Sequence, residues 1–386
     1  MKSLFKYLLL FHLVCLSFIS NGQTYNSFYG SIVNNSSYDS VHNKLIEFEN
    51  HGVKGPGSIQ LLNTFNWLIN YYQEWGYTDI EIDTFIFGGY ESYNLIVTKT
   101  GSVFPSTFVV VDGHYDTKTG TGTNDNGTGT VIILETARLL KDVNTEYSIK
   151  FIHFSMEEVG LVGSSHYVNN VAFPAGMDIK IVFNIDEVGG DITKTNNTIV
   201  CEKDMSTPTA ANAASAAYTD TLATCTELYS NLLTEISFAY ASDYMPFQAK
   251  DYVITGFFEK NETPHRHQAT DSIAYVDVPY VFEIAKATLG ATMQYAVAQT
   301  TSINEQTEVP LSIYPNPTKE ILYIELKNQK LPITYQFINT MGRMIKQGKI
   351  ISKNSSIDMS NLSKGIYFLQ MNGTGFSHSK KIVVTQ

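Results

Sequence analysis

The chain is poor in cysteine, in basic residues and in long hydrophobic segments. It has three cysteines in 386 residues, and its 26 Lys and Arg are outnumbered by 37 Asp and Glu, for a formal net charge of −11. A protein that binds nucleic acid needs a basic face for phosphate contacts, so this charge argues against that class. A hydrophobic fraction of 43%, with 24 Tyr and 22 Phe, excludes a disordered or collagen-like chain.

The one extended apolar segment lies at the N-terminus. Lys2 and Lys6 precede an apolar run over residues 7–19, and small residues follow it. The run is shorter than the roughly 20 residues that a membrane span requires. It therefore predicts a secretory signal peptide over residues 1–22 rather than a membrane anchor.

Cleavage before Gln23 would leave two cysteines, Cys201 and Cys225. Export places them in an oxidising compartment, where thiols commonly pair. We therefore expect a disulfide between them, with two free thiols as the alternative.

Charge is distributed unevenly along the chain. Residues 23–310 contain 14 Lys and Arg against 34 Asp and Glu, whereas residues 311–386 contain ten against three. Such asymmetry indicates two units with different roles. We predict a first domain over residues 23–300, a polar linker over 301–310 and a second domain over 311–386.

In the first domain, short and almost wholly apolar runs alternate with helical patterns. Uninterrupted apolar runs of this length are typical of strands buried on both faces of a mainly parallel sheet. The runs cover residues 107–111, 149–154, 179–185 and 252–258, and the helical patterns cover residues 58–75, 130–141, 210–236 and 278–297. This alternation predicts an α/β domain with helices on both faces of the sheet. Beyond residue 310, short runs separated by turn residues predict a small all-β sandwich.

Histidine and carboxylate side chains directly follow several of the predicted strands. Ligands bind beyond the carboxyl ends of the strands in an open α/β sheet, so these residues should meet at one edge. They are Asp112, His114, Asp116, Glu157, Glu158, Asp186, Glu259, His265 and His267, with Asp125 in a Gly/Thr-rich loop between the first two strands. A single histidine after a strand is usually structural, and His153, inside an apolar run, is predicted to lie in the core.

The combination of these residues suits a binuclear zinc site. Zinc binds imidazole nitrogen and carboxylate oxygen, and two metals can share a bridging carboxylate and activate a water molecule. A further carboxylate, free of metal, must take the proton from that water. The adjacent Glu157 and Glu158 suit the task, because one can reach a metal while the other remains free as the base.

Five segments match, in order, the motifs of peptidase family M28, which includes bacterial leucyl-type aminopeptidases and, as a side branch, glutaminyl cyclases. The segments are Gly113–Thr117, Asn124–Gly129, Glu157–Ser164, Asn184–Asp186 and His267–Asp271. The resemblance implies two zinc ions. The implied ligands are His114 and Asp186 for one zinc, Glu158 and His267 for the other, and Asp125 as the bridge. The same resemblance implies Glu157 as the general base and Asp116 as the carboxylate that orients the His114 imidazole.

Three further positions bear on this motif set. His265 is a rival to His267, although the spacing from His267 to Asp271 matches the family's His-x-x-x-Asp pattern. Many relatives have a histidine where this chain has Tyr244, so the change bears on substrate specificity. Tyr240 could donate a hydrogen bond to the oxyanion, or it could be a structural tyrosine.

The tail resembles the type A C-terminal sorting domain of the type IX secretion system. The matching segments are residues 311–318, 362–368 and 380–384. This resemblance implies contact with the outer-membrane secretion machinery and a location outside the cell, either released or on the cell surface. The alternative is an accessory β-sandwich, for example one that binds carbohydrate.

Together the resemblances imply a secreted aminopeptidase that binds two zinc ions and acts on peptides with a free N-terminus. One alternative is a glutaminyl cyclase, an acyltransferase that uses a single zinc on the same fold. Another is a non-catalytic binding protein that reuses the fold. Such proteins usually lose metal ligands, and all five candidate ligands are present here.

Overall fold

The computed structural model describes residues 23–300, 311–326, 330–339, 343–373 and 376–385. The chain divides into two compact units, Met1–Thr300 and Thr301–Gln386. The predicted signal peptide over residues 1–22 and the predicted linker over 301–310 lie outside the described residues.

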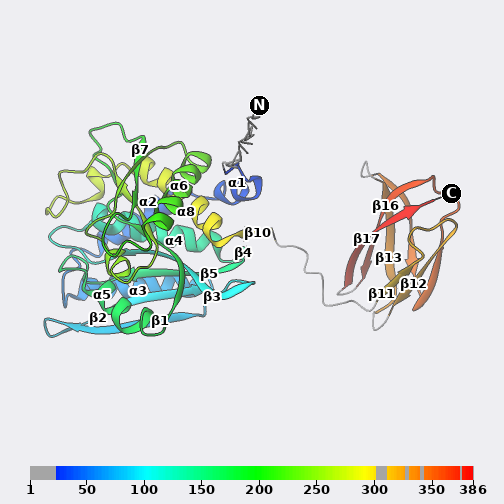
Figure 1. Ribbon diagram of the computed structural model, residues 1–386, viewed down its shortest axis with the longest axis horizontal. Coiled ribbons are helices and arrows are strands. Elements are labelled where there is room, and N and C mark those ends of the chain that lie inside the picture. Colours follow the sequence, from blue (N-terminus) through cyan, green and yellow to red (C-terminus); the bar gives the residue numbers. More distant parts are fainter. Residues whose placement is uncertain (1–22, 301–310, 327–329, 340–342, 374–375, 386) are drawn as a thin grey trace, which may run out of the picture. The chain divides into compact units, whose positions relative to one another are not determined.

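A mixed β-sheet forms the centre of the first unit (Figure 1). It has eight strands in the order β1-β2-β5-β3-β6-β9-β7-β8. The strands are β1 (Ile80–Phe87), β2 (Tyr90–Lys99), β3 (Phe104–His114), β5 (Tyr147–Phe154), β6 (Asp178–Ile185), β7 (Thr198–Lys203), β8 (Leu233–Phe238) and β9 (Ile254–Glu259). Strand β3 pairs in parallel with β5 and β6, and β6 pairs in parallel with β9. These four central strands are the predicted apolar runs, which confirms the mainly parallel sheet.

Helices cover both faces of this sheet. They are α1 (Ser27–Val33), α2 (Tyr38–Asn50), α3 (Ile59–Glu74), α4 (Gly129–Leu140), α5 (Val162–Tyr167), α6 (Asn212–Tyr229), α7 (Met245–Gln248) and α8 (Val278–Ala296). Successive side chains of a strand point to opposite faces. Accordingly, Val109 and Val111 of β3 pack in one apolar cluster with α2, α3, α4, α6 and α8, whereas Val110 packs in another with α5 and α7.

The third helix shows how the sequence sets its ends. The Ser58 side chain accepts a hydrogen bond from the Leu61 N–H and caps the first turn. Gly76 follows the helix with φ +80°, a conformation that favours glycine and ends the helix. Within the described part of the chain, no helix is long and apolar enough to cross a membrane.

One predicted helix is partly wrong. The helical pattern over residues 210–236 divides into α6 and the edge strand β8, with Ser230 in an extended conformation between them. The apolar residues of β8 are Leu233, Ile236 and Phe238, at spacings of three and then two, so periodicity alone does not separate this strand from a helix. Edge pairing with β7 decides its conformation.

The second unit is a β-sandwich of two antiparallel sheets. Their orders are β11-β12-β15 and β14-β13-β16-β17. The strands are β11 (Leu311–Tyr314), β12 (Ile321–Leu326), β13 (Ile333–Asn339), β14 (Met344–Ile350), β15 (Asn354–Asp358), β16 (Gly365–Gly373) and β17 (Phe376–Val384). One apolar cluster joins the two sheets, with Leu322 and Ile324 from the first and Phe337 and Leu369 from the second.

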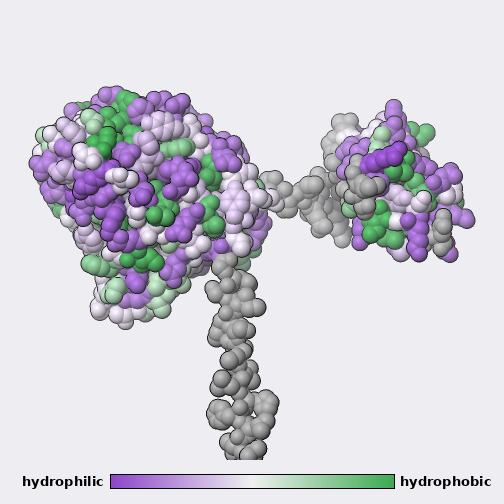
Figure 2. All heavy atoms as spheres, turned by 90° about the horizontal axis from the view of Figure 1, so that it is seen from above, coloured by the Kyte–Doolittle hydropathy of each residue, from purple (hydrophilic) through white to green (hydrophobic). Residues whose placement is uncertain are grey.

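Figure 2 shows one face of the molecule coloured by hydropathy. Hydrophilic residues predominate on the visible surface of both units, and hydrophobic residues form small separate patches. Isolated exposed apolar side chains of this kind are normal for a folded protein.

The predicted disulfide is wrong. Cys201 on β7 and Cys225 on α6 are both buried and both free. Each thiol has a different neighbour, because Cys201 contacts the Thr226 hydroxyl and Cys225 Sγ donates to Gln23 Oε1 at 3.5 Å. A core of this size does not need a covalent cross-link.

We predict that both thiols are protected in the folded protein and available after unfolding. Burial raises the pKa of Cys225 to about 12 and raises that of Cys201 as well, and only the thiolate reacts with alkylating agents. Iodoacetamide without reductant should modify both residues in urea and neither in native buffer, as read by peptide mass spectrometry. A disulfide-linked 201–225 peptide pair would contradict this prediction.

His153 lies in the core, as predicted. It is fully buried, and its Nε2 shares a hydrogen bond of 2.9 Å with the Tyr72 hydroxyl. Burial lowers its pKa from 6.5 to about 3. The folded chain therefore keeps this histidine neutral where the unfolded chain would protonate it.

We expect His153 to destabilise the fold as the pH falls from 6.5 toward 3. In that window the unfolded chain binds a proton that the folded chain does not, so stability falls by up to ~1.4 kcal/mol per pH unit. Urea unfolding of His153→Gln should show a shallower loss of stability than the wild type between pH 6.5 and 4. A His42→Gln control, at a half-exposed histidine, should follow the wild type, and parallel curves for all three proteins would refute the assignment.

Candidate metal centre

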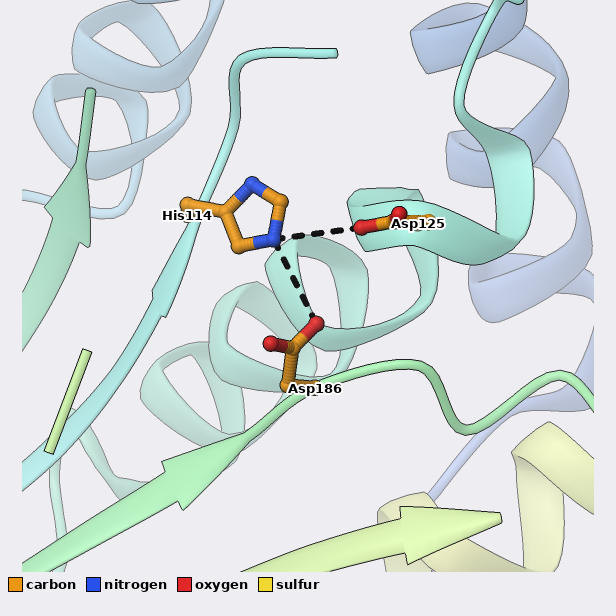
Figure 3. A group of neighbouring side chains, drawn as sticks. All are labelled: His114, Asp125 and Asp186. Carbon is orange, nitrogen blue, oxygen red and sulfur yellow. Dashed lines mark ion pairs between the residues drawn. The ribbon is translucent and has the colours of Figure 1, made fainter. Parts of the chain in front are cut away.

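Three side chains from different elements converge at the carboxyl edge of the sheet. His114 ends β3, Asp186 directly follows β6, and Asp125 lies in the turn η1 (Thr123–Thr128) that precedes α4. Figure 3 shows the three side chains pointing toward one another. His114 Nε2 lies 3.2 Å from Asp125 Oδ1 and 3.3 Å from Asp186 Oδ1.

A second group shares Asp125 with the first. His267 Nε2 lies 3.1 Å from Asp125 Oδ2 and 3.0 Å from Glu158 Oε2. The two carboxylate oxygens of Asp125 therefore face different groups. The structure brings together all five residues that the sequence singled out as ligands, in two groups with the spacing that a metal ion requires.

The donor atoms fit metal ions better than they fit one another. His114 Nε2, Asp125 Oδ2 and Asp186 Oδ1 are buried and have no hydrogen-bond partner among the described residues. Buried polar atoms without partners are rare in folded proteins. Imidazole nitrogen with carboxylate oxygen is a donor set that zinc prefers.

Asp116 contacts residues of both metal groups and their neighbour Glu157. Its carboxylate accepts hydrogen bonds from the backbone N–H groups of Glu157 and Glu158, at 3.0 and 3.2 Å. Its Oδ1 also lies 3.5 Å from His114 Nδ1. Asp116 therefore contacts both the histidine and the backbone of the glutamate pair, and its side chain does not join either metal group.

Glu157 lies beside the first group without belonging to it. Its Oε2 is 3.9 Å from His114 Nε2, and its side chain retains 14% exposure. Burial raises the pKa of Glu157 to about 10, and the neighbouring Asp186 carboxylate adds to the rise while His114 opposes it. Positive charge at the two groups would favour the ionised form, which is the form that accepts a proton.

Two supporting residues carried no role in the sequence analysis. Asp271 accepts hydrogen bonds from the backbone N–H groups of Asn124 and Asp125, at 2.8 and 3.1 Å. The Ser242 hydroxyl donates to Asp186 Oδ2 at 2.7 Å. In the sequence, Asp271 stands out only as the last residue of the His-x-x-x-Asp pattern. Ser242 stands out only because it lies two residues before Tyr244.

The structure separates His265 from the metal groups. Its ring stacks on Tyr275, with centroids 3.7 Å apart, and its Nδ1 shares a hydrogen bond of 2.8 Å with the Thr270 hydroxyl. His265 therefore has a structural environment, and His267 alone of the two reaches Asp125.

Tyr244 lines the pocket beside Asp186 but belongs to neither metal group. Its buried hydroxyl donates to Glu202 Oε2 at 2.6 Å and accepts from the Tyr240 backbone N–H at 3.0 Å. The tyrosine that replaces the histidine of many relatives thus holds the backbone of the 240–244 loop through its hydroxyl. The Tyr240 side chain is 46% exposed and lines a pocket beside Asp186.

Comparisons with known proteins agree with this geometry. The family model described as Peptidase family M28 matches residues 94–292, which is just over half of the chain. Aminopeptidase YwaD of Bacillus subtilis is 34% identical over 111 residues, which cover 28% of this chain and 24% of that protein. The chain spans about a quarter or less of the length of the curated relatives it matches.

Two solved structures show the same fold. Legionella pneumophila LapA aminopeptidase has a TM-score of 0.61 at 20% identity, with 72% of this chain and 78% of that chain covered. A glutaminyl cyclase of Bacteroides thetaiotaomicron has a TM-score of 0.55 at 15% identity, with 66% and 97% covered. At these identities the likeness concerns the fold alone.

The tail has a separate match. Residues 312–385 match the family model described as Secretion system C-terminal sorting domain, which confirms the resemblance and indicates export through the type IX system. The chain therefore belongs to peptidase family M28 and carries a type IX sorting domain at its C-terminus.

Proposed function

We propose that this chain is an exported, zinc-dependent aminopeptidase that binds two zinc ions and removes N-terminal residues from peptides. The observation that carries the proposal is the division of Asp125 between two groups, with one oxygen near His114 and the other near His267. A carboxylate in this position suits a bridge between two metals.

Each residue then has a distinct task. His114 and Asp186 would hold one zinc, Glu158 and His267 the other, and Asp125 both. Bound zinc supplies a Lewis acid and an activated water nucleophile. Glu157 takes the proton of the attacking water and returns it to the leaving amine. Asp116 and Ser242 keep His114 and Asp186 in place through the contacts described above.

The proposed partners follow from the two units. Peptides with a free N-terminus are the proposed substrates of the first unit, in keeping with the aminopeptidase names of the curated relatives. The secretion machinery of the outer membrane is the proposed partner of the tail.

Glutaminyl cyclase activity is the second candidate, because a cyclase structure shares the fold. The presence of two complete metal groups favours the peptidase. Two zinc ions per chain with cleavage of leucyl-p-nitroanilide would support the peptidase. One zinc with cyclisation of N-terminal Gln peptides would support the cyclase.

We predict that Glu157→Gln keeps both zinc ions and lowers kcat by about 10²- to 10⁴-fold, the usual contribution of general acid–base catalysis. The side chain keeps its size but loses the atom that accepts the proton. Turnover of leucyl-p-nitroanilide and zinc content by atomic absorption are the measurements, with the exposed Glu74→Gln as control. Wild-type turnover in a zinc-loaded Glu157→Gln variant would overturn the role of this residue.

We predict that Asp271→Asn weakens zinc binding by about 10- to 100-fold, the usual cost of removing a partner that orients a ligand. One oxygen of the carboxylate becomes an NH2 group and would face a backbone N–H that now lacks an acceptor. Competition with a chromophoric chelator measures the affinity. Asp251→Asn, at an exposed aspartate, is the matched control, and equal zinc affinity in both variants would count against the positioning role.

A further inference from the structure

A narrow pocket lies directly beside the metal groups. Its lining includes the ligand Asp186 together with Glu187, Glu202, Tyr240 and Arg266. The space open to a water-sized sphere is about 10 Å³, which is room for about one water molecule. The pocket therefore accepts a small group and excludes a whole side chain.

Glu187 lines this pocket and has one acceptor atom without a hydrogen-bond partner among the described residues. It directly follows Asp186, adopts a positive φ of 47° and is 4% exposed. One oxygen, Oε1, lies 2.8 Å from Arg266 Nε. The other, Oε2, is buried and has no hydrogen-bond partner in the described ranges of the chain. A buried carboxylate oxygen in this state calls for a donor.

The charges around the pocket favour a cation. Three carboxylates, those of Asp186, Glu187 and Glu202, face one guanidinium, that of Arg266. Glu202 already accepts a hydrogen bond from the Tyr244 hydroxyl at 2.6 Å. Arg266 Nε lies 2.8 Å from Glu187 Oε1, so the single guanidinium compensates the charge of one of the three carboxylates. A water-sized cation with hydrogen-bond donors is an ammonium group.

We propose that Glu187, held in place by Arg266, binds the α-ammonium group of the substrate's N-terminal residue. The inference rests on the proposed aminopeptidase function and names the residue that would require a free N-terminus. The α-nitrogen and the scissile carbonyl carbon are two bonds apart, so an ammonium group beside Asp186 leaves that carbonyl next to the metal groups. Arg266 acts through Glu187 and is a positioning residue.

The test compares two ligands that differ only in the amine. Leucine hydroxamate and 4-methylpentanohydroxamate share the zinc-binding group and the side chain, and only the first has the α-ammonium group. Calorimetric titration at pH 7 into the zinc-loaded protein measures both affinities without turnover. Glu187→Gln should lose about 10- to 100-fold in affinity for leucine hydroxamate, as expected for a charge-assisted hydrogen bond, and keep its affinity for the amine-free ligand.

Two further variants keep the test sharp. Glu262→Gln removes one negative charge from an exposed position near Tyr240 and should leave the ratio of the two affinities unchanged. Glu187→Asp keeps the negative charge, but its side chain is shorter by one methylene group. Its ratio of the two hydroxamate affinities should therefore fall between the ratios of the wild type and of Glu187→Gln. For leucyl-p-nitroanilide, KM should rise in Glu187→Gln more than kcat falls.

Equal losses for both hydroxamates, or no loss for either, would overturn the proposal while leaving the peptidase assignment intact. A wild-type protein that binds zinc but neither hydroxamate, and does not cleave leucyl-p-nitroanilide, would instead refute the proposed function and this inference with it. Melting temperature and zinc content of each variant establish that the comparison is made between folded, loaded proteins.

Discussion

The rest of the site depends on the Asp125 carboxylate, which the two metal groups share. It lies within 3.2 Å of His114 Nε2 on one side and 3.1 Å of His267 Nε2 on the other. Asp271 accepts hydrogen bonds from backbone N–H groups in the same turn, and the Asn126 side chain donates to the Ile185 carbonyl at the end of β6. One turn thereby links three segments that are far apart in the chain.

Electrostatics explains why this arrangement needs cations. Burial raises the pKa of Glu158 to about 8, and the adjacent Asp125 carboxylate adds to the effect. The pKa of Glu157 is raised further, to about 10, mainly by burial. Carboxylates crowded in a water-poor region favour protonation unless positive charge compensates them. The Arg266 guanidinium is paired with Glu187, so bound metal ions would be a fitting source of the remaining positive charge.

The support around the ligands accounts for the departure at Tyr244. Its hydroxyl binds Glu202 and the Tyr240 backbone, and both residues line the pocket beside Asp186. Tyr244 lines the same pocket itself, so it forms part of the pocket wall and also holds two of its neighbours there.

Much of the fold and the centre of the site could be predicted from the sequence. Apolar runs such as 149–154 and 179–185 predict buried parallel strands because such strands have no solvent-facing side. Parallel strands end at one edge, so His114 and Asp186 were expected to meet there. The all-β tail follows from the loss of helical periodicity after residue 310.

Tertiary structure alone decided the remaining features. Strand β8 forms because it pairs with β7. Cys201 and Cys225 are free because each thiol has its own local contacts. The proposed roles of Asp271 and Glu187 depend on packing between segments that are distant in the chain. Strand ends and buried runs are local properties, so the amino-acid sequence determined where ligands would gather. Hydrogen-bond partners and thiol pairing depend on distances in space, which residue order does not contain.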